Sequence, residues 1–275
     1  MGKLLKILFS YALALSMLIP FLWMVSTSFK ENTEVFVFPI SWIPKHFNLD
    51  GYRAVWQESK LGVDFAVFYI NSLKVSAIVI IGTYFSCSLA AYSYAKIQFK
   101  GREWMFLLKL STMMVPFQVT MIPTFMLYRN FGLLDTHAAL WLPSFLGSSF
   151  GVFLLRQFYM SIPEDLTESA RIDEAGHLRI YWSMIMPLTK PAMISLIVLT
   201  FIATWNNYET PLLYLRSPNL YTIPLGLKVM VDDIYNINYP GIMAGVVCSL
   251  IPILLLFAAA QKYFVQGITF SGTKG

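Results

Sequence analysis

The sequence predicts an all-α, polytopic membrane protein with six transmembrane helices, and three observations support this. Hydrophobic residues make up 57% of the 275 residues and charged residues only 13%, whereas soluble domains carry about 25% charged residues. Six apolar runs are each close to the length of about 20 residues that a helix needs to cross a bilayer. The centre of every run contains no Asp, Glu, Lys or Arg. A single soluble core is therefore not expected.

The six expected spans form one transmembrane domain over residues 1–275, with span ends defined to within a few residues. They lie at about 8–29, 67–95, 105–128, 138–160, 188–209 and 241–264. The first run follows Lys3 and Lys6, as the apolar part of a signal peptide would. It continues to about Val25 without a small-residue cleavage site. We therefore interpret it as a retained first span.

The distribution of Lys and Arg predicts the orientation, because these residues are enriched in loops on the cytoplasmic side. With the N-terminus inside, that side receives the basic loop AKIQFKGR (95–102) and most of the 20 Lys and Arg residues. Both termini and the polar loop 161–187, between the fourth and fifth spans, are then cytoplasmic. Residues 30–66 and 210–240 are expected outside, and four prolines exclude a continuous helix in the second of these segments.

Several classes of site are not expected from the composition. Cys87 and Cys248 lie inside apolar runs and are predicted to be free, buried thiols. No Cys and His cluster has metal-ligand spacing, so no metal site is predicted. The net charge of +5 arises from basic residues near the ends of apolar runs, which favours membrane topology over a nucleic-acid partner. The chain lacks a G-x-x-x-x-G-K-[ST] phosphate-binding motif, so we expect no enzyme activity in it.

The loop 161–187 is polar and carries the signals of two short helices. Ser161 and Glu164 have capping-box spacing, with Pro163 in the first turn. Gly176 is expected to end the first helix in a left-handed conformation. The second helix shows apolar residues at positions i, i+3, i+4 and i+7, namely Leu178, Tyr181, Trp182 and Ile185.

Physical chemistry alone leaves two interpretations of this loop open. It could be a solvated hairpin that merely joins two spans. It could instead dock in a groove of a cytoplasmic partner, because the small Ser169 and Ala170 would let another backbone approach closely.

Several motifs of the chain resemble those of permease subunits of ATP-binding-cassette carbohydrate importers. The loop pattern of that family is Glu-Ala-Ala, two residues, Asp-Gly-Ala and, farther on, an apolar-Pro end. Its positions are occupied here by Glu168, Ser169, Ala170, Asp173, Ala175 and Pro187. Glu174 stands where the pattern commonly has glycine, and Gly176 follows two residues later. The resemblance continues in INSLKVS (70–76), AAYSYAKIQFKGR (90–102), MMVPFQVTMIPTFMLYRNFGLLDT (113–136), FLLRQFYMSIPEDLTESARIDEAG (153–176) and TWNNYETPLLYL (204–215).

The chain is most similar to the shorter, six-span partner of the heterodimeric, maltose-importer-like permeases. This resemblance implies that the 161–187 loop is a coupling helix seated on an ATPase subunit. The coupling residues would be Glu168, Ser169, Ala170, Asp173, Ala175 and Gly176. It also implies a second homologous permease subunit, two ATPase subunits that bind ATP and Mg, and an extracellular or periplasmic solute-binding protein. The membrane would be the plasma (inner) membrane of a bacterium or archaeon.

The transported solute implied by the resemblance is a carbohydrate, first an oligosaccharide and second a glycerol-phosphate-like solute. Sugars are recognised by hydrogen bonds and by aromatic faces, so polar and aromatic residues at membrane depth are candidates for the pathway. They are Gln118, Trp205, Asn206, Asn207 and Tyr208. Two alternatives remain, because the asparagines could tie helices together or cap a helix end, and the longer permease subunit could supply the deeper sugar contacts.

Two other functions fit the sequence less well. An ion-coupled secondary transporter would usually place Asp, Glu or His inside its spans, and the span centres contain none. A structural or assembly membrane protein would not need the coupling-loop pattern.

Overall fold

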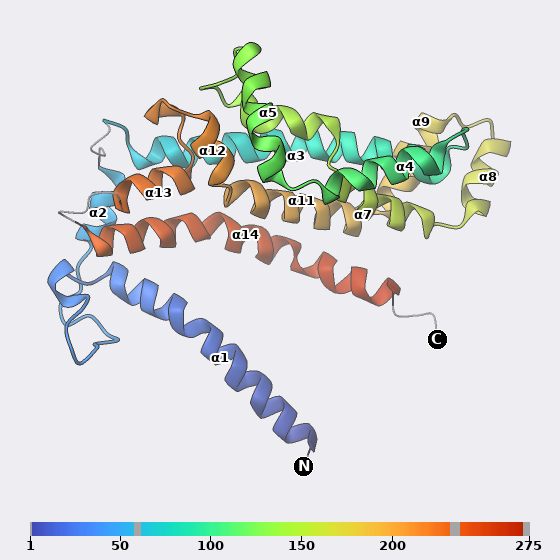
Figure 1. Cartoon of the computed structure of the whole chain (residues 1–275). Helices are drawn as coiled ribbons and strands as arrows, with labels where there is room; N and C mark the ends of the chain where they lie inside the picture. The colour runs from blue at the N-terminus through green and yellow to red at the C-terminus, as the bar shows by residue number, and fades with distance from the viewer. Residues whose placement is uncertain (1, 58–61, 232–236, 272–275) are drawn as a thin grey trace. The chain divides into compact units, whose positions relative to one another are not determined.

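A computed structural model describes residues 2–57, 62–231 and 237–271 (Figure 1). The regular structure of these residues is helical, with no β-strand among them, so the all-α prediction is confirmed. The chain divides into two compact units. Unit 1 comprises Met1–Ile70 and Tyr221–Ile253, and unit 2 comprises Asn71–Leu220 and Leu254–Gly275.

Four uninterrupted helical stretches of the described chain are long and apolar enough to cross a membrane. They are α1 (Gly2–Ser28), α3 (Phe65–Lys96), the stretch Ala138–Met160, and the part Tyr239–Lys262 of α14 (Tyr239–Ser271). The third stretch contains α6 (Ala138–Trp141), η3 (Leu142–Leu146) and α7 (Ser149–Met160). These stretches correspond to four of the six apolar runs.

Two sharply bent pairs of helices account for the other two apolar runs, and the first helix of the second pair lies almost wholly in the 161–187 loop. The pairs are α4 (Arg102–Ser111) with η2 (Thr112–Met114) against α5 (Phe117–Asn130), bent by 97°, and His177–Leu188 against α11 (Lys190–Trp205), bent by 78°. Pro116 explains the first bend, because it forces Val115 into extended backbone (ψ 114°). Pro191 stands in the first turn of α11, directly after the second bend. The described residues thus contain up to six candidate spans if each bent pair counts as one.

In unit 1, residues that the sequence places outside the membrane form short helices. They are η1 (Asn32–Glu34), α2 (Asp50–Trp56) and α13 (Ile223–Val231). Asn32 joins distant parts of the chain, because its amide group donates to the Ile237 carbonyl (2.9 Å) and its Oδ1 accepts from the Tyr239 N–H (3.1 Å). Gly51 permits a close approach, since an added Cβ would lie 2.9 Å from the Pro240 backbone.

The core of unit 2 packs α3, α7 and α11 together with the end of the 161–187 loop. Gly151 of α7 lies so close to α3 that an added Cβ would be 2.7 Å from Cys87 Sγ. The Ser88 hydroxyl bonds the hydroxyls of Tyr159 (2.7 Å) and Tyr181 (2.6 Å) inside this core. Both cysteines of the chain are free and buried, as predicted.

Candidate functional site

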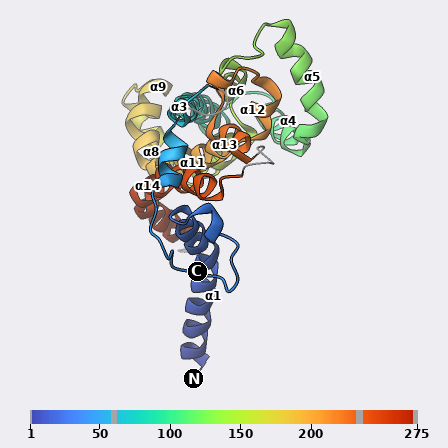
Figure 2. The same ribbon diagram turned by 90° about the vertical axis from the view of Figure 1, so that its left-hand side faces the viewer.

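The 161–187 loop contains two short helices joined by a turn. α8 (Glu164–Ile172) is followed by α9 (His177–Ile180), the π-helical turn η4 (Tyr181–Ile185) and α10 (Met186–Leu188). Figure 1 shows α8 and α9 at the end of unit 2 where α3 ends. Figure 2, which views α3 nearly end-on, shows both helices on one side of α3.

The start of α8 differs from the predicted capping box. Pro163 occupies the N-cap position, without a side-chain capping bond. The Ser161 hydroxyl instead donates to the Phe158 carbonyl (2.7 Å). Ser161 is the C-cap of α7, and its backbone N–H and its hydroxyl both donate to the Phe158 carbonyl. The capping-box prediction is therefore wrong, although the acidic Glu164 and Asp165 do stand in the first turn of α8.

The end of α8 is a Schellman motif whose left-handed residue is Glu174. The Ala175 N–H donates to the Ala170 carbonyl and the Glu174 N–H to the Arg171 carbonyl, both at 3.0 Å. Glu174 has φ 57°, whereas Gly176 has φ −66° and is the N-cap of α9. The prediction that Gly176 supplies the left-handed turn is therefore wrong. The turn falls at the position where the family pattern commonly has glycine.

Glu174→Gly should stabilise the α8–α9 turn, because a left-handed conformation costs a non-glycine residue about 1–2 kcal/mol. We expect a rise in the midpoint of thermal unfolding of the purified chain in detergent. Glu174→Gln is the matched control, since it removes the charge but keeps the Cβ, and it should leave the midpoint nearly unchanged. An equal rise with Glu174→Gln would assign the effect to charge rather than to the backbone.

The six predicted coupling residues do not all face outward. Glu168, Ser169, Asp173 and Gly176 are exposed, whereas Ala170 and Ala175 are half-buried and pack against the core of unit 2. Ala170 therefore packs in part on its own chain, and its contact with a partner stays a prediction. Ser169 is exposed, and its hydroxyl donates to the Asp165 carbonyl (2.7 Å).

The predicted apolar face of the second short helix is split. Tyr181 and Ile185 are buried, but Leu178 and Trp182 are 70% and 51% exposed. Within the π-helical turn at Tyr181–Ile185, the residue spacing differs from that of an α-helix. A π-helical turn holds more residues than an α-helical turn, so the spacing i, i+3, i+4 and i+7 no longer places all four side chains on one face.

Apolar and acidic side chains share the exposed surface of α8 and its turn, which we call the α8 surface. Its apolar residues are Leu166, Ile172 and Leu178, which are 43%, 81% and 70% exposed. Its acidic residues are Glu164, Asp165, Glu168, Asp173 and Glu174. The sequence interpretation missed Ile172, and its signal was an isoleucine directly before the charged Asp173 and Glu174.

Three of the four candidate pathway residues near the end of α11 make local contacts. Trp205 is only 2% exposed and stacks on Phe201, with ring centroids 5.2 Å apart. The Asn206 amide donates to the carbonyl four residues earlier (2.9 Å), and Asn207 Oδ1 accepts from the N–H three residues later (3.2 Å). Tyr208 is half-buried at the start of α12 (Glu209–Tyr214). These contacts favour the helix-end alternative for the two asparagines.

Gln118 is exposed at the border of a cavity of about 330 Å³ in unit 2. The cavity is lined by Phe117, Gln118 and Met121 of α5 and by Glu209, Leu212 and Leu213 of α12. It brings Gln118 together with Glu209, the last residue of the polar and aromatic cluster TWNNYE that the sequence indicates for the pathway. An amide and a carboxylate among apolar walls could hydrogen-bond the hydroxyl groups of a solute.

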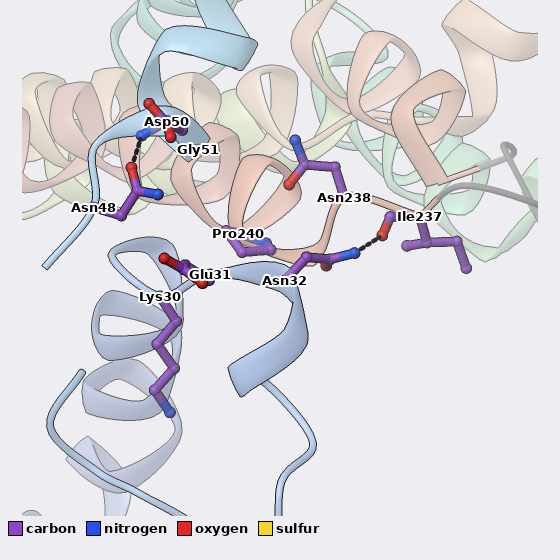
Figure 3. Close-up of a pocket in the computed structure, with 9 residues that line it drawn as sticks. All are labelled: Lys30, Glu31, Asn32, Asn48, Asp50, Gly51, Ile237, Asn238 and Pro240. Carbon is purple, nitrogen blue, oxygen red and sulfur yellow. Dashed lines mark hydrogen bonds between the residues drawn. The ribbon is translucent and has the colours of Figure 1, made fainter. Parts of the chain in front are cut away.

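A second cavity, of about 380 Å³, lies in unit 1 among residues that the sequence places outside the membrane (Figure 3). Its lining includes Asn32, Asn48, Asp50 and Asn238.

Lys30 also lines this cavity, but Figure 3 shows its side chain directed away from the other lining residues. Its ammonium donates to the Ser41 carbonyl (2.6 Å). Burial lowers the pKa of Lys30, and the Glu34 carboxylate acts in the opposite direction.

Comparisons with known proteins identify the family. Residues 82–270 match the family described as binding-protein-dependent transport system inner membrane component. The chain is 33% identical to the arabinooligosaccharides transport system permease protein AraQ of Halalkalibacterium halodurans, over 93% of this chain and 91% of the relative. It is 32% identical to the galactooligosaccharides transport system permease protein GanQ of Bacillus subtilis, over 98% of this chain and 96% of the relative.

A solved structure is also similar over nearly the whole chain. It is the crystal structure of a bacterial ABC transporter involved in the import of the acidic polysaccharide alginate. The similarity has a TM-score of 0.84 at 26% identity and covers 95% of this chain and 96% of that chain. The sequence resemblance is thus confirmed, and the chain belongs to the family of binding-protein-dependent transport system inner membrane components.

Proposed function

We propose that the chain is one of two transmembrane subunits of an ATP-driven importer and forms half of the translocation pathway for an oligosaccharide. Two similar permeases are named for arabinooligosaccharide and galactooligosaccharide transport, and the similar solved transporter imports a polysaccharide. Membership of a binding-protein-dependent family argues against the alternative of an ion-coupled secondary transporter.

The α8 surface is the observation that carries this proposal. Ile172 exposes 81% of its surface beside five exposed acidic residues. A large apolar side chain with this exposure gains free energy when a partner covers it. The matching partner surface is an apolar cleft with basic side chains at its rim. A docked ATPase subunit would meet this description, and the exposed coupling residues Glu168, Ser169, Asp173 and Gly176 would lie in the contact.

The proposed assembly contains a second homologous permease, two ATPase subunits that bind ATP and Mg²⁺, and a solute-binding protein outside the membrane. This chain would contribute one transmembrane domain of six spans and hold no cofactor or metal itself. Both termini and the α8 surface would lie in the cytoplasm of a bacterium or archaeon. The segments around the unit 1 cavity would then face the solute-binding protein.

Within the pathway, we assign solute contact first to Gln118 together with Glu209. Both line the same cavity in unit 2. Trp205, Asn206 and Asn207 would shape the end of α11 beside it, because their side chains are buried or bonded to the helix end, and the half-buried Tyr208 would follow them.

The test is uptake of a labelled oligosaccharide by inside-out and right-side-out vesicles that contain the complete transporter. We expect uptake into right-side-out vesicles to require internal ATP and the external solute-binding protein. Ionophores that collapse proton and sodium gradients should leave it unchanged. Uptake that persists without ATP and stops with an ionophore would contradict the proposal and favour the ion-coupled alternative.

A further inference from the structure

The last carbonyl groups of α3 are bound by arginine side chains from other helices of unit 2. Carbonyls at a helix C-terminus have no partner within the helix and carry partial negative charge. Arg156 Nε of α7 donates to the Tyr94 carbonyl (3.2 Å), and Arg171 Nη2 of α8 donates to the Lys96 carbonyl (3.2 Å). One of the groups that cap α3 therefore belongs to α8.

The Lys96 side chain makes the reciprocal contact. It is only 7% exposed, and its Nζ donates to the carbonyl of Ile162 (2.7 Å), the residue before Pro163, the N-cap of α8. The Glu164 carboxylate attracts this ammonium and the Arg171 guanidinium repels it. Lys96 thus contacts both ends of α8, because its ammonium binds the carbonyl before the helix and its carbonyl accepts the guanidinium from the last turn.

The other contacts of α8 with the core are made by short side chains. Thr167 is 4% exposed, and its hydroxyl donates within its own helix to the Glu164 carbonyl (2.8 Å). Ala170 is half-buried against the core. Apolar contacts of such small groups are weak and non-directional, whereas charge-assisted hydrogen bonds are short and directional. The two hydrogen bonds of Lys96 are therefore directional contacts that join both ends of α8 to the end of α3.

We propose that Lys96 is the positioning residue that transmits movement of α8 to α3. The proposal rests on the proposed docking of α8 on an ATPase subunit. A displacement at either end of α8 acts on the same residue, which ends a helix of 32 residues (Phe65–Lys96). Without the ammonium, α8 would still present its exposed surface for docking, but its motion would no longer be passed on completely.

Lys96→Met tests this, because it keeps an apolar stem and removes the ammonium. In vesicles with the complete transporter, ATPase association should remain while the amount of solute transported per ATP falls. Loss of one charge-assisted hydrogen bond should lower about tenfold the population in which Lys96 holds both ends of α8 against α3, an arrangement that we call the clamp. This factor is equivalent to about 1.4 kcal/mol. Lys96→Arg should restore part of the coupling. Lys100→Met is the matched control, because Lys100 is exposed in the same basic loop, and it should transport normally.

A distance measurement tests the clamp without the ATPase. Spin labels on cysteines at Gln98 and Asp165, two exposed positions after α3 and on α8, would be placed in a background with Cys87→Ala and Cys248→Ala. Their distance distribution should broaden with Lys96→Met and narrow again with Lys96→Arg. If Lys96→Met does not accumulate in the membrane, Arg171→Met removes the other bond and should broaden the distribution equally. The exposed Arg179→Met is its control.

Unchanged distances and full coupling in Lys96→Met would overturn the positioning role. Loss of ATPase association with unchanged distances would overturn it as well, because Lys96 would then act in docking itself. The proposed function fails by a different result, namely ATPase association that survives disruption of the α8 surface. In either case, the distance measurement shows whether Lys96 holds α8 against α3.

Discussion

Ile172→Glu should abolish co-purification of the ATPase subunits with the permease and stop solute uptake. Ile172 is 81% exposed on the α8 surface, so the substitution leaves the core of this chain intact. In the docked state it would place a carboxylate in an apolar cleft and add charge to an already acidic surface. Truncation of a central anchor residue of an interface costs about 2 kcal/mol or more, and the buried charge adds to this loss. The measurement is ATPase pull-down with affinity-tagged permease, followed by solute-stimulated ATP hydrolysis.

Ile43→Glu is a closely matched control for this experiment. Ile43 is also 81% exposed, but it lies in the segment 30–66, on the opposite side of the membrane in the proposed topology. The variant should keep its ATPase subunits. Equal loss of the ATPase in both variants would indicate general misfolding, and retention in Ile172→Glu would show that α8 does not dock.

The helical architecture could be predicted from the sequence because it depends on local patterns. Apolar runs of sufficient length predicted α3 to within two residues at each end, whereas α1 begins six residues before its run and α14 continues seven residues beyond its run. The bend before α5 also has a local cause in Pro116. The division of the 161–187 loop into two short helices was predictable from its polar residues and its turn signals.

The details of the candidate site depended on contacts that no local pattern contains. Lys96 and Arg171 are 75 positions apart in the sequence, so the spacing of residues could not reveal their bond. The left-handed Glu174 escaped prediction because glycine is the usual residue there and Gly176 offered a plausible substitute. The burial of Ala170 could not be foreseen either, because it follows from how α8 is held against α3.

Glu103→Leu should destabilise the chain by about 3 kcal/mol, because it leaves the Arg156 guanidinium buried without its counter-ion. Arg156 Nη2 lies 2.8 Å from both carboxylate oxygens of Glu103. The Arg156 side chain is 8% exposed and the Glu103 side chain 56%, so water reaches only one partner. The guanidinium also lies over the Phe106 ring, 3.9 Å from its centroid. The free energy of unfolding in mixed detergent micelles measures the loss.

The double variant Glu103→Leu with Arg156→Met separates the ion pair from the other contacts of Arg156. Removing both charges should recover part of the stability lost in Glu103→Leu, since no buried charge remains. The recovery should be incomplete, because the Tyr94 carbonyl at the end of α3 loses its arginine donor. Arg102→Met is the control. It removes the other arginine near Glu103, whose Nε lies 3.1 Å from Glu103 Oε1, and it keeps the buried pair of Glu103 and Arg156. Strictly additive losses in the double variant would show that Glu103 and Arg156 stabilise the chain independently, and α4 would then be held to α7 by packing alone.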